Sequence, residues 1–110
     1  MSRRDVKLLL DDILTAIAKI ERYVAGLDRE QFLNDEKSID AVVRNLEIIG
    51  EATRQLPDEF TAQHLSIPWT QMAGLRNRIV HEYFGLDLDI IWEIIHHYLP
   101  ELRQQIQLLK

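Results

Sequence analysis

Four side chains that could act on a phosphate ester lie within eight residues of one another. Arg76, Asn77, His81 and Tyr83 supply a guanidinium, an amide, an imidazole and a phenol. A guanidinium can hold a phosphate through two parallel hydrogen bonds, and an imidazole can accept or donate a proton near neutral pH. Residues 60–81 contain no Asp or Glu, although the whole chain has 18 acidic and 13 basic residues. This stretch is therefore the first candidate for a catalytic or anion-binding site.

Arg76 falls on an unusual side of the helix that the pattern predicts around it. On a helical wheel of about 100° per residue, Arg76 lies near the middle of an apolar arc. That arc comprises Trp69, Met72, Ala73, Leu75, Ile79, Val80 and Tyr83. Because an unpaired buried guanidinium is strongly destabilising, Arg76 needs either a carboxylate partner or a cleft in which an anion binds.

The spacing of Arg76 and His81 limits where they could share a ligand. The two residues are about 140° apart on an ideal helix, so they cannot both point at one phosphate from its middle. They converge if the site lies at the C-terminal end of the helix, or if two such helices face each other. Asn77 precedes His81 by four residues and shares its side of the helix. A salt-bridged arginine and a half-exposed histidine would fit the spacing equally well, so both interpretations stay open here.

The hydrophobic pattern predicts an all-α chain. Apolar residues recur at three- and four-residue steps in a first helix that ends near Gly26. Ser2 with Asp5 resembles a capping box at its start, and Asp28 with Gln31 predicts a short second helix. The expected core residues of the first helix are Val6, Leu9, Leu10, Ile13, Ile17, Ile20 and Val24.

Two apolar rows run along a long third helix, which we expect to begin near Ser38. The core row comprises Ile39, Val42, Val43, Leu46, Ile49 and Leu56, and the second row comprises Ala41, Asn45, Ile48 and Ala52. A helix with two apolar rows buries two sides. This pattern predicts a bundle that also dimerises.

Prolines mark the later helix boundaries. Pro57 and Pro68 suit the first turns of a short fourth helix and of a fifth helix from Trp69 to about Tyr83. The fifth helix should stop at Gly85. Pro100 should bend or restart the last helix near Leu99. That helix should open at Asp87 or Asp89, and its apolar residues are Ile90, Ile91, Ile94, Ile95, Tyr98, Leu102, Ile106 and Leu109.

Composition sets the broad class of the protein. The 110 residues predict one domain, 1–110, with one continuous core. No apolar run is long enough to cross a membrane, and no secretory leader is recognisable. The absence of cysteine excludes disulfides and thiolate metal sites, so we expect a cytoplasmic location. A net charge of −5 argues against binding nucleic acid through overall charge, but it allows a local basic cleft.

Other polar residues predict no second site. His96 and His97 are neighbours that point about 100° apart, so one metal ion would not hold both. His64 stands alone, and Asp87 and Asp89 fit helix capping better than cation binding. Arg44 and Arg54 have acidic residues three or four positions away and should form ion pairs. Trp69 and Trp92 are expected in the core. We predict no metal and no cofactor.

The segment around Arg76 resembles a known family. The signature of HEPN-domain ribonucleases is an arginine followed by a polar residue, with a histidine a few residues later. Arg76, Asn77 and His81 resemble it, with four residues between the arginine and the histidine. Tyr83, two residues after the histidine, gives the form found in HepT-type toxins. Residues 43–52 (VRNLEIIGEA), 67–69 (IPW), 72–77 (MAGLRN) and 81–85 (HEYFG) are similar to the same family. The resemblance covers nearly the whole chain, and no motif position departs from it.

The resemblance implies a fold, an activity and partners. It implies a HEPN-type antiparallel bundle of four to six helices that forms a homodimer, with the motifs of both protomers lining a shared cleft. It implies an endo- or exoribonuclease that needs no metal, with Arg76 and His81 catalytic and Asn77 supporting them. It also implies a type VII-like toxin–antitoxin pair, in which an MntA-like nucleotidyltransferase antitoxin transfers AMP to Tyr83.

The residues suit that chemistry, but a rival remains. Metal-free RNA cleavage needs a proton acceptor, a proton donor and stabilisation of charge on phosphorus, which imidazoles and a guanidinium can supply. One chain has one motif histidine, whereas a dimer has two. The rival is a non-catalytic module that binds a nucleotide or docks a nucleotidyltransferase. His81 favours catalysis, because a neutral imidazole adds little to a simple anion clamp.

Overall fold

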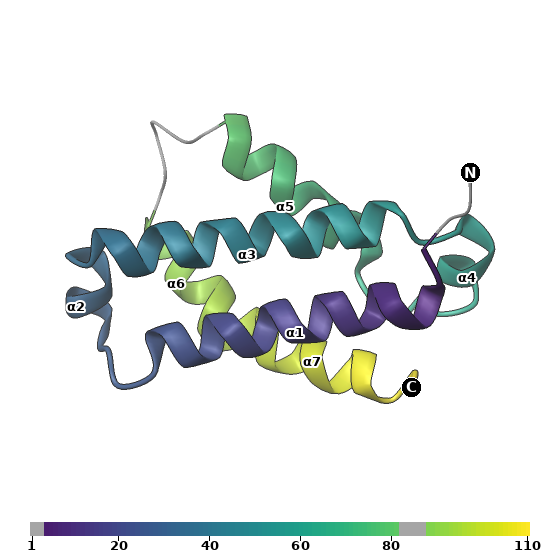
Figure 1. Cartoon of the computed structure of the whole chain (residues 1–110), viewed down its shortest axis with the longest axis horizontal. Coiled ribbons are helices and arrows are strands. Elements are labelled where there is room, and N and C mark those ends of the chain that lie inside the picture. Colours follow the sequence, from purple (N-terminus) through teal and green to yellow (C-terminus); the bar gives the residue numbers. More distant parts are fainter. Residues whose placement is uncertain (1–3, 82–87) are drawn as a thin grey trace.

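Helices make up all the regular structure in the described part of the chain. The computed structural model describes residues 4–81 and 88–110, with side chains for 4–75 and 88–110. In Figure 1, α1 (Val6–Val24) and α3 (Glu36–Arg54) lie side by side, and the short α2 (Arg29–Leu33) joins them at one end. This arrangement confirms the predicted all-α fold class.

The remaining helices pack on both sides of this pair. After the short α4 (Asp58–Ala62), α5 (Trp69–His81) packs on α3. A continuous helical segment then runs through α6 (Leu88–Glu93), the π-helical turn η2 (Ile94–Tyr98) and α7 (Leu99–Gln107), and α7 packs on α1. With that segment counted once, the described ranges contain six helical segments, within the four to six predicted. None of these helices is long and apolar enough to cross a membrane.

The core forms from the stripes that the sequence predicts. Leu9, Ile13, Ile17 and Ile20 of α1 are at most 1% exposed, and six predicted core-row residues of α3 and its C-terminal flank are buried. In the second row of α3, Asn45 and Ala52 are buried, while Ala41 and Ile48 are half-buried. Asn45 satisfies its buried amide by donating a hydrogen bond of 2.9 Å to the carbonyl of Ala41. The third helix therefore does carry two largely apolar rows.

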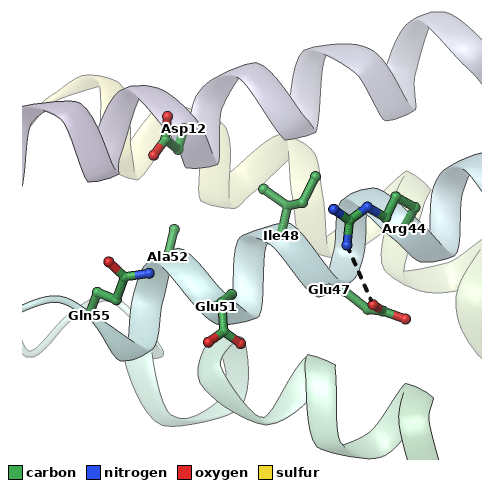
Figure 2. A pocket seen from close by; sticks show the side chains of 7 residues that line it. All are labelled: Asp12, Arg44, Glu47, Ile48, Glu51, Ala52 and Gln55. Carbon is green, nitrogen blue, oxygen red and sulfur yellow. Dashed lines mark ion pairs between the residues drawn. The ribbon is translucent and has the colours of Figure 1, made fainter. Parts of the chain in front are cut away.

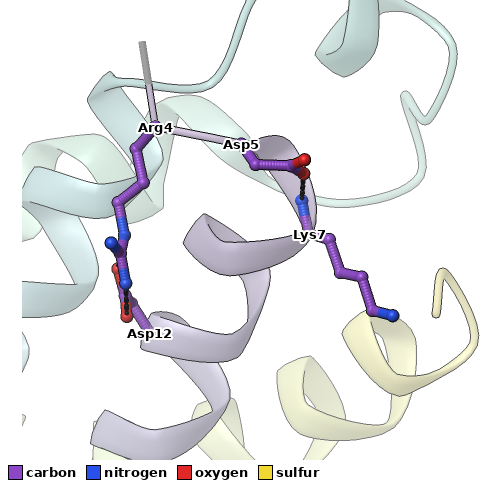
Figure 3. Close-up of polar contacts among 4 residues, drawn as sticks. All are labelled: Arg4, Asp5, Lys7 and Asp12. Carbon is purple, nitrogen blue, oxygen red and sulfur yellow. Dashed lines mark hydrogen bonds and ion pairs between the residues drawn. The ribbon is translucent and has the colours of Figure 1, made fainter. Parts of the chain in front are cut away.

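The start of α1 differs from the predicted capping box. Asp5 is itself the N-cap, and its carboxylate accepts a hydrogen bond of 2.8 Å from the backbone N–H of Lys7 (Figure 3). We had expected Asp5 in the third helical position after a cap at Ser2, which lies outside the described residues. Next to the cap, the Arg4 guanidinium donates hydrogen bonds of 2.7 and 3.0 Å to the two carboxylate oxygens of Asp12. These hydrogen bonds raise the pKa of Arg4.

Acidic caps also start the next two helices. Asp28 and Gln31 form the predicted capping box of α2. The long α3 begins at Glu36, close to Ser38 as predicted, and Asp35 is its N-cap. The hydroxyl and the backbone N–H of Ser38 both donate to Asp35, and these bonds lower the pKa of the Asp35 carboxyl. Ser38 thus supports the cap from inside the helix.

Pro100 restarts the last helix as predicted, through a turn that the pattern did not reveal. A proline has no backbone N–H to donate to the carbonyl four residues earlier. The chain instead widens into η2, where the N–H of Leu99 donates to the carbonyl of Ile94, five residues back. Ile91, Ile95, Leu102 and Ile106 are buried as expected. Ile90, another apolar residue of this helix, is 37% exposed.

Candidate functional site on α5

The described part of α5 supports the predicted apolar arc. Trp69, Met72 and Leu75 are buried, at 8, 0 and 7% exposure, on the helix that packs against α3. Arg76 follows Met72 by four residues and Trp69 by seven, so its Cα lies on this same face of α5. The backbone therefore places Arg76 on the side of α5 that turns toward the bundle.

The other predicted site residues lie on the same helix or just beyond it. Asn77 and His81 belong to α5, whose described part ends at His81. Five residues of helix separate Arg76 from His81, or roughly 7.5 Å along the axis. Tyr83, the predicted modification site, lies outside the described residues. The structure thus confirms the helix that carries the motif as far as His81.

A cluster of aromatic rings fixes the start of this helix. The indole N–H of Trp69 donates a hydrogen bond of 2.9 Å to the carbonyl of His64. The ring of Phe60 lies 4.8 Å from that of His64 and 6.0 Å from that of Trp69, between ring centroids. His64 therefore serves as a packing residue, and these contacts hold α5 in place on the bundle. Pro68 immediately precedes α5, as predicted.

A groove of about 390 Å³ opens over the second row of α3 (Figure 2). Its lining, which we call the acidic groove, consists of Asp12, Arg44, Glu47, Ile48, Glu51, Ala52 and Gln55. Arg44 lies 3.9 Å from Glu47 on the next turn, as predicted, and Asp12 is held by Arg4. Three carboxylates line this groove, so it is poorly suited to a polyanion such as RNA.

A second hollow, of about 600 Å³, lies between α5 and the last helical segment. We call it the α5–α7 pocket; Gln71, Gly74, Leu75, Glu93, Ile94, His97, Tyr98 and Glu101 line it. The Tyr98 hydroxyl is buried and has no hydrogen-bond partner in the described part of the chain. Burial raises the pKa of Tyr98, so the hydroxyl is protonated at neutral pH.

The two adjacent histidines diverge as predicted. His96 stacks on Trp92 with 3.9 Å between ring centroids, and its Nδ1 lies 3.0 Å from the Trp92 carbonyl. His97 instead approaches Glu93, with 3.2 Å between Nε2 and the carboxylate. Among the described side chains, no group of three or more His, Asp or Glu residues could hold a metal ion. Asp89 pairs with Arg29, and Asp87 is outside the described residues.

Sequence reasoning missed Gly74 and the roles of Tyr98 and Glu101. Tyr98 was expected in the apolar stripe of the last helix, and its ring does pack beside the core. The pocket lies between two helices that are distant in the sequence, so no local sequence pattern predicts it. One signal was available, because a glycine in the middle of a helix is destabilising and calls for an explanation.

Comparison with known proteins identifies the family. The sequence profile described as "Ribonuclease HepT-like" matches residues 13–109. The chain belongs to the HepT-like ribonuclease family. This membership confirms both the predicted resemblance and the predicted enzyme class, a ribonuclease.

Individual relatives of this HepT-like chain cover nearly its full length. A Methanocaldococcus jannaschii protein, named as a candidate RNase, is 37% identical over 109 residues, or 99% of this chain and 100% of its own length. The "Probable ribonuclease HepT" of Thermococcus cleftensis is 39% identical over 108 residues, or 98% of each chain. The "mRNA nuclease HepT" of Shewanella oneidensis is 33% identical, covering 91% of this chain and 97% of its own length. No solved structure matches the chain.

Proposed function

We propose that this HepT-like protein is a metal-independent ribonuclease whose catalytic residues are Arg76 and His81. The observation that supports the proposal is the position of Arg76: its Cα lies on the same face of α5 as Trp69 and Met72, whose side chains are buried. A guanidinium on a helix face that turns toward the bundle needs a negatively charged partner, and a bound anion can supply it. Membership of a ribonuclease family makes an RNA phosphodiester the expected anion.

The proposed reaction is an internal transfer at phosphorus. The imidazole of His81 takes the proton of the ribose 2′-hydroxyl, whose oxygen attacks the phosphorus and displaces the 5′-oxygen. A second imidazole donates a proton to that leaving oxygen, so the products are a 2′,3′-cyclic phosphate and a 5′-hydroxyl. Arg76 stabilises the charge that develops on the phosphoryl oxygens. Asn77, four residues before His81, supports the imidazole.

This mechanism requires two copies of the chain, because each contributes one motif histidine. A homodimer would supply both the base and the acid, and the half-buried Ala41 and Ile48 of the second row on α3 leave apolar surface for pairing. Activity should therefore fall when the protein is diluted below the concentration at which dimers form. Analytical ultracentrifugation across the same range would give that concentration. Full activity of a demonstrated monomer would exclude the shared site.

We also propose a toxin that an antitoxin silences through Tyr83. An MntA-like nucleotidyltransferase would transfer AMP from ATP to the Tyr83 hydroxyl with release of pyrophosphate. The added phosphate would compete with RNA for Arg76. Co-expression with such a partner should add AMP to the wild-type chain and not to Tyr83→Phe, as read by mass spectrometry. AMP found on the Tyr83→Phe chain would disprove this assignment.

The test of the nuclease is cleavage of cellular RNA in EDTA by wild type, Arg76→Ala and His81→Ala. Each protein is first checked by mass spectrometry for the absence of AMP. Wild type should cut and leave cyclic phosphate ends, while each variant should lose about 100-fold or more in rate. If no AMP-free preparation cuts, the chain is better described as a nucleotide-binding or docking partner of a nucleotidyltransferase.

A further inference from the structure

Gly74 is a glycine that the described fold does not require. It lies within α5, where a glycine is less favourable than an alanine. Its φ is not in the left-handed region; among the described residues only Gly26, at 82°, has that conformation. Apart from its two chain neighbours and the backbone of its own helix, no atom of the described residues lies within 4 Å of the position that a Cβ would take. The missing side chain therefore leaves the α5–α7 pocket open to a molecule that approaches the α5 backbone.

Tyr98 gives a second reason to place a ligand in this pocket. A buried hydroxyl without a partner is destabilising, and the Tyr98 hydroxyl has none in the described structure. It belongs to the π-helical turn η2, a type of turn that often occurs at functional sites. Tyr98 lines the pocket, and its hydroxyl is buried behind that lining. The open space of the pocket thus lies beside a residue with an unmet hydrogen-bonding group.

The lining indicates the chemistry of that ligand. Leu75 and Ile94 provide apolar surface, on which a flat ring can pack. Glu93 and Glu101 place carboxylates at the rim, and these accept hydrogen bonds and repel phosphate. Glu101 has no ion-pair partner among the described side chains, whereas the Glu93 carboxylate contacts the His97 imidazole. A flat ring that carries N–H donors fits both features, and nucleobases are such rings.

We propose that the α5–α7 pocket binds a guanine base of the RNA, beside the bond that is cleaved. Guanine carries two adjacent N–H donors on one edge, at N1 and N2, and these match the two oxygens of the Glu101 carboxylate. Single-stranded RNA exposes that edge, so a protein can read it in this way. Gly74 precedes His81 by seven residues, or roughly 10 Å along α5, and both Cα atoms lie on one face. The location relative to the cut rests on the proposed function, but the binding of the base does not.

Direct binding of nucleoside monophosphates tests the pocket without any cleavage. In calorimetry, guanosine monophosphate should bind wild type at least tenfold more tightly than uridine monophosphate. Gly74→Phe should abolish guanosine monophosphate binding by filling the pocket, and Glu101→Gln should erase the preference for guanosine. Glu59→Gln removes an exposed carboxylate from α4 and should change neither value. Equal affinity for both nucleotides, or unchanged guanosine monophosphate binding by Gly74→Phe, would overturn the proposal.

Sequencing the ends of RNA fragments then tests the position of the base. Wild type should show guanosine at one fixed position near the cut, and Glu101→Gln should lose that preference while still cutting. A cut without any guanosine preference would remove the base from the reaction. If wild type binds guanosine monophosphate but cuts no RNA, the nuclease proposal fails and the pocket remains a nucleotide site.

Discussion

The acidic groove and the α5–α7 pocket are both open hollows, but they differ in whether their polar side chains have partners within the chain. In the groove, Asp12 is held by Arg4 and Glu47 faces Arg44, so the chain itself supplies partners for these two carboxylates. In the pocket, the Tyr98 hydroxyl has no partner among the described residues, and Gly74 leaves space that the helix does not need. This difference is why we propose a ligand for the pocket on the α5 side and not for the acidic groove.

The largest expected effect contrasts the two sides of α5. Met72 is fully buried, so Met72→Ala should lower the free energy of unfolding by about 2–5 kcal/mol. Gly74→Ala, two residues away, should instead raise it by up to about 1 kcal/mol, because nothing lies near the added methyl group. Urea denaturation measures both values. A loss of stability in Gly74→Ala would mean that the fold itself needs this glycine.

A smaller effect is expected from the buried hydroxyl of the pocket. Tyr98→Phe removes a group that has no partner in the described structure, so the ligand-free protein should gain about 1 kcal/mol. The same change should weaken binding of guanosine monophosphate. Tyr23→Phe is the control on α1 and should alter stability by less than about 0.5 kcal/mol. If Tyr98→Phe destabilises the ligand-free protein, the hydroxyl is already bonded in solution.

The smallest effect concerns the acidic groove. Asp12→Asn breaks the contact with Arg4 (Figure 3), but both side chains are substantially exposed, at 36 and 47%. We expect a small drop in the urea midpoint at low salt that disappears at high salt, because salt screens exposed charges. Asp5→Asn removes a charge from the same helix but keeps the cap, so its midpoint should not change. A large, salt-independent loss in Asp12→Asn would show that the groove is a structural centre.

Sequence patterns predicted the helices better than they predicted how those helices begin. Pro57, Pro68 and Pro100 mark boundaries because a missing N–H has the same consequence in any context. The cap of α1 was misplaced because Asp and Ser accept the same hydrogen bond, and the apolar stripe does not say which one does so. Asp5 holds that position in the structure.

In the candidate site, the sequence predicted the local motif but not the pocket. The motif from Arg76 to His81 stands out in the sequence because its residue types and spacing are local. The α5–α7 pocket does not, because Gly74 and Tyr98 are distant in the sequence and meet only when the last helical segment packs near α5. The π-helical turn that carries Tyr98 depends on a hydrogen bond from Leu99 to Ile94, which no pattern of residue types specifies.

The most direct test compares initial rates of cleavage of one guanosine-containing RNA in EDTA by wild type, His81→Ala and Arg44→Ala. His81 lies in the proposed catalytic motif on α5, whereas Arg44 lines the acidic groove. The account predicts that His81→Ala loses about 100-fold or more, while Arg44→Ala stays within about twofold of wild type. Wild-type rates in His81→Ala, or a loss confined to Arg44→Ala, would contradict a nuclease centred on α5.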